Sequence, residues 1–139
     1  MALQKRDVVE FIRSKGLGVV STVTKDKSPE GALVNLAVTD DLELVFYAIE
    51  TTRKCSNLRR NPRIAVVIGW DHEPTLQYEG LADEPQGSEL ERLKEIYALA
   101  RPNAAGQMAW PGLTYFRVRP KWVRLSDYRS RWSVQELSF

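Results

Sequence analysis

Two threonines followed by two cations, Thr51–Lys54, are the residues whose types and spacing most directly indicate chemistry. Thr52 suits a helix N-cap, because its hydroxyl can accept a hydrogen bond from a free first-turn amide. Arg53 and Lys54 would then lie at the positive end of the helix dipole, where carboxylates are normally favoured. A bound anion would make this arrangement favourable, since amides, hydroxyls, a guanidinium and an ammonium could contact phosphate oxygens. The pattern predicts a phosphate site; the alternative, that both long side chains extend into solvent, stays open.

Strand and helix signals on either side explain how these residues would be positioned. The run Val45–Ile49 is apolar and rich in β-formers, which predicts a strand. A short helix is expected over Arg53–Arg60, because Asn61-Pro62 must end it. The stretch therefore predicts a strand, a turn carrying the threonines, and a helix that begins with the two cations.

The remaining segments are strand-like runs joined by short polar turns, which favour antiparallel pairing and a barrel or sandwich. An amphipathic helix is expected at Leu3–Lys15, ending at Gly16. A second helix is expected from a capping box formed by Ser88 and Glu91 up to Pro102. Residues 101–112 are expected to form a long loop, and residues 127–139 an arginine-rich tail. The expected strands are Gly18–Thr24, Gly31–Val38, Val45–Ile49, Arg63–Trp70, Thr75–Ala82 and Leu113–Ser126.

Length and composition predict an ordinary globular protein. A chain of 139 residues is expected to form one domain, residues 1–139, with a single core. The net charge of +2 does not indicate general polyanion binding. The single cysteine, Cys55, excludes an internal disulfide framework and fits a reducing cytoplasm. No secretory leader and no membrane-spanning run are recognised, so a cytoplasmic protein without membrane contact is expected.

The order of residues from Phe46 to Gln77 carries a family resemblance. It follows FY-x-x-x-[ST]-[ST]-RK-x-x-x-[LI]-x-x-NPR, then an apolar strand, Trp70 and a Leu76-Gln77 pair. This order resembles the pyridoxamine 5'-phosphate oxidase-like, FMN-binding split-barrel superfamily, and the resemblance extends over nearly the whole chain. It implies a mainly β fold: an antiparallel split β-barrel of six to seven strands with N-terminal, middle and inter-strand helices.

The resemblance also implies which residues would hold a cofactor. Thr52, Arg53 and Lys54 match the segment that binds the FMN phosphate, and Thr51 lies next to it. The glutamine that contacts the flavin in the oxidases corresponds to Gln77. Near the end, Arg124 matches an arginine that grips pyridoxal phosphate. Four other oxidase positions are replaced by residues unable to do the same work, namely Ala32, Ala37, Ser126 and Glu136.

The resemblance implies a homodimer with flavin between the protomers and hydride or two-electron transfer to or from a small organic molecule or nicotinamide donor. A true pyridoxine 5'-phosphate oxidase is not expected, because the vitamin-binding positions are altered. The deazaflavin F420 is an alternative cofactor. A non-catalytic flavin carrier or stress-response protein is an alternative function, and no catalytic side chain is identified.

Two further patterns have simpler explanations. The stripe of Arg117, Arg119 and Lys121, extended by Arg124, could bind nucleic acid, but a solvated strand edge that discourages pairing is favoured. Asp71-His72-Glu73 are consecutive and the chain has no second histidine, so metal binding is not expected.

Overall fold

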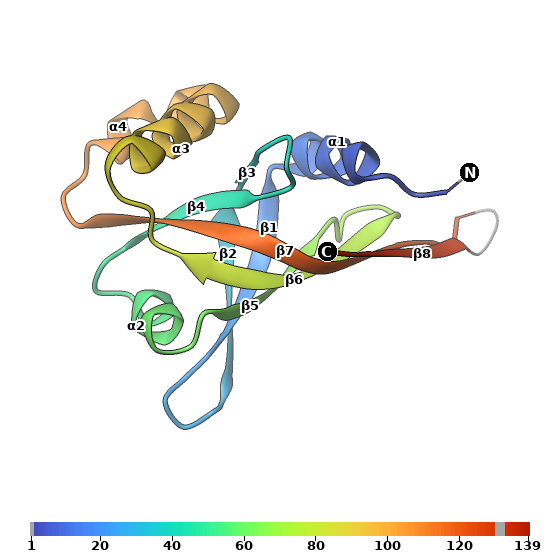
Figure 1. The fold of residues 1–139 in the computed structure, drawn as a ribbon, viewed down its shortest axis with the longest axis horizontal. Helices are drawn as coiled ribbons and strands as arrows, with labels where there is room; N and C mark the ends of the chain where they lie inside the picture. Colours follow the sequence, from blue (N-terminus) through green and yellow to red (C-terminus); the bar gives the residue numbers. More distant parts are fainter. Residues whose placement is uncertain (1, 130–132) are drawn as a thin grey trace.

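The computed structural model describes residues 2–129 and 133–139, and its centre is one curled antiparallel sheet (Figure 1). Among the described residues the strands are β1 Leu17–Val23, β2 Pro29–Asn35, β3 Ala37–Val38, β4 Leu44–Ile49, β5 Arg63–Ile68, β6 Thr75–Asp83, β7 Leu113–Asp127 and β8 Ser133–Ser138. The helices are α1 Lys5–Lys15, α2 Arg53–Arg60, α3 Gly87–Ala100 and α4 Ala105–Met108, with a 3-10 turn at Pro102–Ala104. The expected mainly β, antiparallel split barrel is confirmed.

Strand β7 holds the sheet together. The strand order is β2-β1-β5-β6-β7-β4-β3, and β8 also pairs with β7, so that β7 contacts three strands along its 15 residues. Its N-terminal half pairs with β4, its C-terminal half with β8, and both halves with β6. Figure 1 shows α3 and α4 together above the β4 side, with α2 on the other side of the sheet.

The main core fills the inside of the curled sheet and is covered by the apolar face of α1. Val8 and Ile12 of α1 are fully buried, and Phe46 and Phe116 stack with their ring centroids 5.5 Å apart. The buried hydroxyl of Tyr78 lies 2.9 Å from the Leu42 carbonyl oxygen, and burial raises the pKa of this phenol. Gly16 ends α1 with φ 69°, as its position in the sequence predicts.

A smaller core lies between α3 and the outer side of β4 and β7. Tyr47 and Tyr115 are direct cross-strand partners, and Tyr97 of α3 packs against both rings. Leu93 of α3 is also buried, whereas Ala100 at its end is exposed. This cluster fixes α3 on the sheet.

Several expected boundaries are wrong, and at Leu36 and in the tail a contact with another segment decides the local structure. The expected second strand is divided at Leu36, whose amide donates to the Gly16 carbonyl instead of continuing the ladder. The expected capping box is not formed, because α3 already begins at Gly87 with Gln86 as N-cap. The 101–112 segment contains a 3-10 turn and α4, and the tail contains β8, which pairs with β7.

The expectation of a solvated edge at the arginine stripe is also wrong. Strand β7 is internal, and Arg117 is only 6% exposed. Its Nη2 lies 2.7 Å from Asp83 Oδ2, and Glu43 and Glu89 lie within 4.0 Å of the same guanidinium. The hydrogen bonds with Asp83 raise the pKa of Arg117. Three carboxylates therefore surround Arg117, whereas Arg119 and Lys121 of the same stripe are exposed.

None of the helices in the described part of the chain is both long and apolar enough to cross a membrane.

We expect Arg117→Ala to lower the free energy of unfolding by about 3 kcal/mol, because it leaves Glu43 and Asp83 without their buried counter-charge. Arg119→Ala is the matched control, since the Arg119 side chain approaches the same acids but is 60% exposed. Its loss should stay below about 1 kcal/mol. Urea denaturation of both variants measures the difference, and equal losses would contradict the buried role of Arg117.

Candidate functional site

The start of α2 presents free backbone amides beside the predicted phosphate-binding residues. Helix α2 has the bounds that the sequence predicts, and Thr52 is its N-cap with φ −74° and ψ 156°. The expected hydroxyl cap is wrong: Thr52 Oγ1 donates backwards to the Ile49 carbonyl over 2.7 Å. Within residues 2–129 and 133–139 no side chain caps the first turn, which contains no acidic residue. Its amides are therefore available to an anion.

The body of α2 is anchored to the sheet, so that its first turn has a fixed position. Cys55 and Leu58 are buried in the main core, and Asn57 Nδ2 donates to Thr22 Oγ1 over 3.0 Å in a buried contact. On the last turn, Arg59 holds Glu84 by two hydrogen bonds of 3.0 Å. These bonds raise the pKa of Arg59.

Arg53 forms an ion pair that follows from this anchoring. Arg53 and Asn57 are four residues apart and share one face of α2. Asn57 contacts Thr22, whose cross-strand partner on β2 is Glu30. Arg53 Nε accordingly lies 2.5 Å from Glu30 Oε2. The Arg53 side chain is still 74% exposed, whereas that of Glu30 is 15% exposed.

Glu50, the acid closest in sequence, is not the partner of Arg53. Its carboxylate lies 3.6 Å from Arg59 Nη1, and its backbone amide donates to the Gly112 carbonyl. Lys54 has no ion pair among the described residues and is partly exposed. The structure thus brings Thr51, Thr52, Arg53 and Lys54 together at one corner with Glu30 beside them.

The other two predicted cofactor contacts form a second group, on the outer face of β6 and β7. Gln77 and Arg124 are direct cross-strand partners. Arg124 Nη2 lies 2.7 Å from Glu136 Oε2, and its guanidinium lies over the Trp122 ring. Hydrogen bonds from Trp122 and then Arg124 lower the pKa of Glu136. Glu136, which the family resemblance pairs with an oxidase arginine, therefore forms an ion pair with the guanidinium of Arg124.

A ligand that contacts both groups has to be elongated. The end of β6 adjoins α2, because the Ala82 amide donates to the carbonyl of Pro62, just beyond that helix. Gln77 lies several residues earlier on β6. A molecule with an anionic group at one end and a planar polar ring at the other would match this arrangement: the anionic group would contact the first turn of α2, and the ring would lie beside Gln77.

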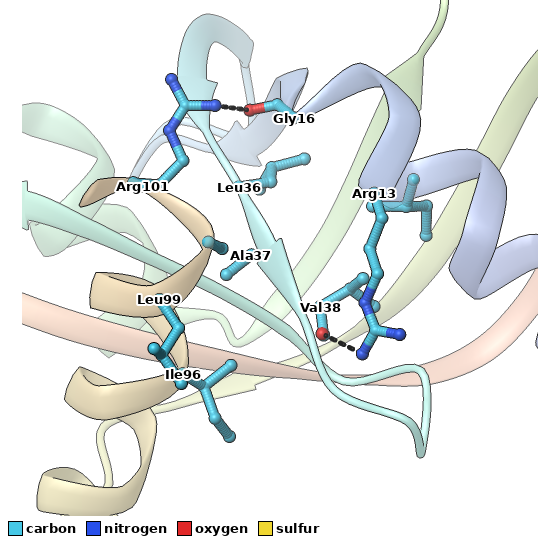
Figure 2. Close-up of a pocket in the computed structure, with 10 residues that line it drawn as sticks. Arg13, Gly16, Leu36, Ala37, Val38, Ile96, Leu99 and Arg101 are labelled. Atoms are coloured by element: carbon cyan, nitrogen blue, oxygen red, sulfur yellow. Dashed lines mark hydrogen bonds between the residues drawn. The ribbon is translucent and has the colours of Figure 1, made fainter. Parts of the chain in front are cut away.

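A cavity of about 450 Å³ lies between α1, β3 and the end of α3 (Figure 2). Ala37, one of the two alanines that the family resemblance pairs with an arginine and a lysine of the oxidases, lines it together with the apolar side chains of Leu36 and Ile96. Arg101 borders the cavity and donates to the Gly16 carbonyl and to Asn35 Oδ1 over 3.2 and 2.6 Å. The site residues expected from the sequence did not include Arg101. Its position between the end of a helix and Pro102 is the sequence feature that could have pointed to it.

The Asp71-His72-Glu73 segment forms the loop between β5 and β6. Asp71 pairs with Lys15 at 3.2 Å, which lowers the pKa of the carboxyl, and His72 is exposed. No group of three or more His, Cys, Asp or Glu side chains is placed to hold a metal within residues 2–129 and 133–139.

Comparison with known proteins assigns the family. Residues 5–127 match the family model described as pyridoxamine 5'-phosphate oxidase. The chain belongs to the pyridoxamine 5'-phosphate oxidase family. It is 32% identical over 111 residues to the pyridoxine/pyridoxamine 5'-phosphate oxidase of Enterobacter sp. (strain 638), covering 79% of this chain and 49% of that protein. The chain therefore spans about half the length of the curated relatives it matches.

Solved structures of family-like fold align with nearly all of the chain. A heme binding protein from Mycobacterium smegmatis aligns with a TM-score of 0.81 and 17% identity, over 97% of this chain and 59% of that one. General Stress Protein 26 from Bacillus anthracis str. Sterne aligns with a TM-score of 0.72 and 20% identity, over 97% and 98%. At these identities the likeness concerns the fold alone.

Proposed function

We propose that the protein binds FMN and is an oxidoreductase that acts on a small organic molecule or a nicotinamide donor in the cytoplasm. The observation that supports this is the first turn of α2, where uncapped amides lie beside Arg53 and Lys54. A phosphate is the anion that best uses amides, a guanidinium and an ammonium together. F420 is the alternative cofactor, because the same basic corner would hold its phosphate.

The residues of the two groups would have different tasks toward the cofactor. Thr51, Thr52, Arg53 and Lys54 would hold the phosphate, while the Gln77 amide can donate to and accept from a flavin ring. Arg124 would supply positive charge near that ring, reduced by its pair with Glu136. When bound, the flavin supplies two-electron chemistry, and the protein supplies orientation and electrostatics.

Replacing Arg53 by Ala tests the phosphate assignment. The loss of a charge-assisted contact, worth about 1.5 to 3 kcal/mol, should weaken FMN binding about ten- to a hundred-fold. The free energy of unfolding of the apoprotein should fall by no more than about 1 kcal/mol, because an unpaired Glu30 is partly offset by removing a cation from the helix start. FMN titrations and thermal melts of both apoproteins measure the two effects.

Arg60→Ala is the control for this test, since Arg60 is an exposed arginine on the last turn of the same helix. It should leave FMN affinity unchanged. An Arg53→Ala protein that is much less stable but binds FMN as the unmodified protein does would refute the phosphate assignment.

The cavity beside Ala37 suits a substrate other than a vitamin phosphate. The methyl group of Ala37 cannot pair with a phosphate, and Leu36 and Ile96 make that wall apolar. Arg13 and Arg101 are the cationic groups at the border. Two hydrogen bonds hold Arg101 toward Gly16 and Asn35, and Arg13 Nη2 donates to the Val38 carbonyl over 3.2 Å. A small organic molecule with apolar surface fits this lining better than pyridoxine 5'-phosphate does.

We expect the FMN-loaded protein to form no significant pyridoxal 5'-phosphate from pyridoxine 5'-phosphate, because Ala32, Ala37, Ser126 and Glu136 stand in place of polar or basic residues of the oxidases. Product formation followed by its absorbance, with a known oxidase as positive control, measures this. Robust turnover would show that the pairing of Ala32 and Ala37 with the oxidase positions is wrong.

The outer sheet face supports a homodimer that includes the flavin site. Leu33, Val19 and Val67 are successive cross-strand partners and therefore form one row, which Gln77 continues. Leu33 and Val67 are 59% and 42% exposed, and Leu81 of the same sheet is 40% exposed. An apolar row that leads directly to Gln77 fits an interface along which the flavin would lie.

The protein is accordingly expected to sediment as a dimer at micromolar concentration. Val67→Asp should shift it toward the monomer and weaken FMN binding, because it places a charge in the centre of the apolar row. Leu99→Asp is the control, since Leu99 is 85% exposed on α3 and should change neither property. A flavin-loaded monomer in sedimentation velocity would contradict the proposed interface.

A non-catalytic flavin carrier would share the same corner and the same dimer. Steady-state turnover with a nicotinamide donor distinguishes the oxidoreductase from the carrier, because the flavin of a carrier would stay oxidised. Heme, named for the Mycobacterium smegmatis protein, is less favoured here because the chain's single histidine, His72, lies in an exposed loop. The visible spectrum of the purified protein distinguishes flavin from heme.

A further inference from the structure

A carboxylate lies inside the basic corner at the start of α2. Glu30 extends from β2, and its side chain is 15% exposed. Its Oε2 lies 2.5 Å from Arg53 Nε, yet this buried oxygen has no hydrogen-bond partner among the described residues. The two opposite charges are in direct contact, while the Arg53 side chain is 74% exposed and has five N–H donors, so that it can also donate to another acceptor.

Glu30 changes the charge that a bound anion would meet. Arg53 and Lys54 bring two positive charges, and Glu30 cancels one of them. Arg59, on the last turn of α2, adds no free positive charge, because it is paired with Glu84 and Glu50. Glu30 therefore reduces the positive charge that attracts an anion to this corner, and the reduction matters more for a doubly charged group.

We propose that Glu30 is a specificity residue that weakens binding of a doubly charged phosphomonoester at this corner more than binding of a singly charged phosphodiester. The proposal rests on the proposed function, since it concerns the phosphate of the same cofactor. A phosphomonoester carries about 1.5 to 2 negative charges at neutral pH, whereas a phosphodiester carries a single charge. Repulsion by Glu30 acts about twice as strongly on the former.

Two ligands with the same flavin isolate this effect. FMN is a phosphomonoester, and riboflavin 4',5'-cyclic phosphate is a phosphodiester. Glu30→Gln removes the charge but keeps an oxygen beside Arg53. It should tighten FMN binding by about tenfold and binding of the cyclic phosphate by only about threefold. Quenching of flavin fluorescence by the apoproteins measures the four dissociation constants.

Controls separate charge selection from other roles. Glu10→Gln removes one charge from an exposed position on α1 and should leave the affinity ratio of the two ligands unchanged. Glu30→Ala should shift the ratio in the same direction as Glu30→Gln. Thermal melts of the apoproteins check that each variant is folded.

Two results would overturn the proposal while leaving the proposed function intact. An equal loss of affinity for both ligands in Glu30→Gln would mean that Glu30 only positions Arg53. Binding with an unchanged ratio would mean that Glu30 does not sense the ligand's charge. Failure of every folded variant to bind either flavin would instead overturn the proposed function and this proposal together.

Discussion

The pairing of β7 with three other strands is the constraint on which the rest of the structure depends. Because β7 pairs with β4, β6 and β8, it joins the two halves of the sheet. The same pairing places Gln77 opposite Arg124 and Tyr47 opposite Tyr115. The Gln77–Arg124 pair on the outer face and the tyrosine cluster beneath α3 are therefore both consequences of how β7 pairs with its neighbours. Burial of Arg117 among carboxylates then links α3 and the end of β6 to this strand.

Much of the fold could be predicted from the sequence where local signals decide the structure. Helix α2 has its expected bounds because Asn61-Pro62 ends it whatever the surroundings, and Gly16 ends α1 by its left-handed conformation. Prediction failed where distant contacts decide. The division at Leu36 depends on the Gly16 carbonyl, and β8 exists because β7 offers an unpaired side. Period-two spacing placed Arg117 on a face but could not show that acids from three other elements cover that face.

The candidate site also has one part that local sequence signals predict and one part that depends on contacts between distant residues. Thr51–Lys54 could be recognised because their spacing at the start of a helix has a direct electrostatic meaning. Glu30 could not, because it lies 23 positions before Arg53 and meets it only through the pairing of Thr22 with Glu30 and the bond from Asn57 to Thr22. Most contacts between exposed charges fluctuate and contribute little. The Arg53–Glu30 ion pair differs, because the buried bond from Asn57 to Thr22 holds the two elements together beside it. The resemblance to a family identified the positive residues and was silent on the negative one.

The position of Glu30 also bears on how the chain tolerates two cations at a helix start. Without an anion, the dipole and the adjacent charges of Arg53 and Lys54 all disfavour the first turn of α2. A partly buried carboxylate 2.5 Å from Arg53 offsets part of this cost in the ligand-free protein. The same carboxylate must then repel any phosphate that arrives, so stability without a ligand is gained at the expense of affinity for highly charged ligands.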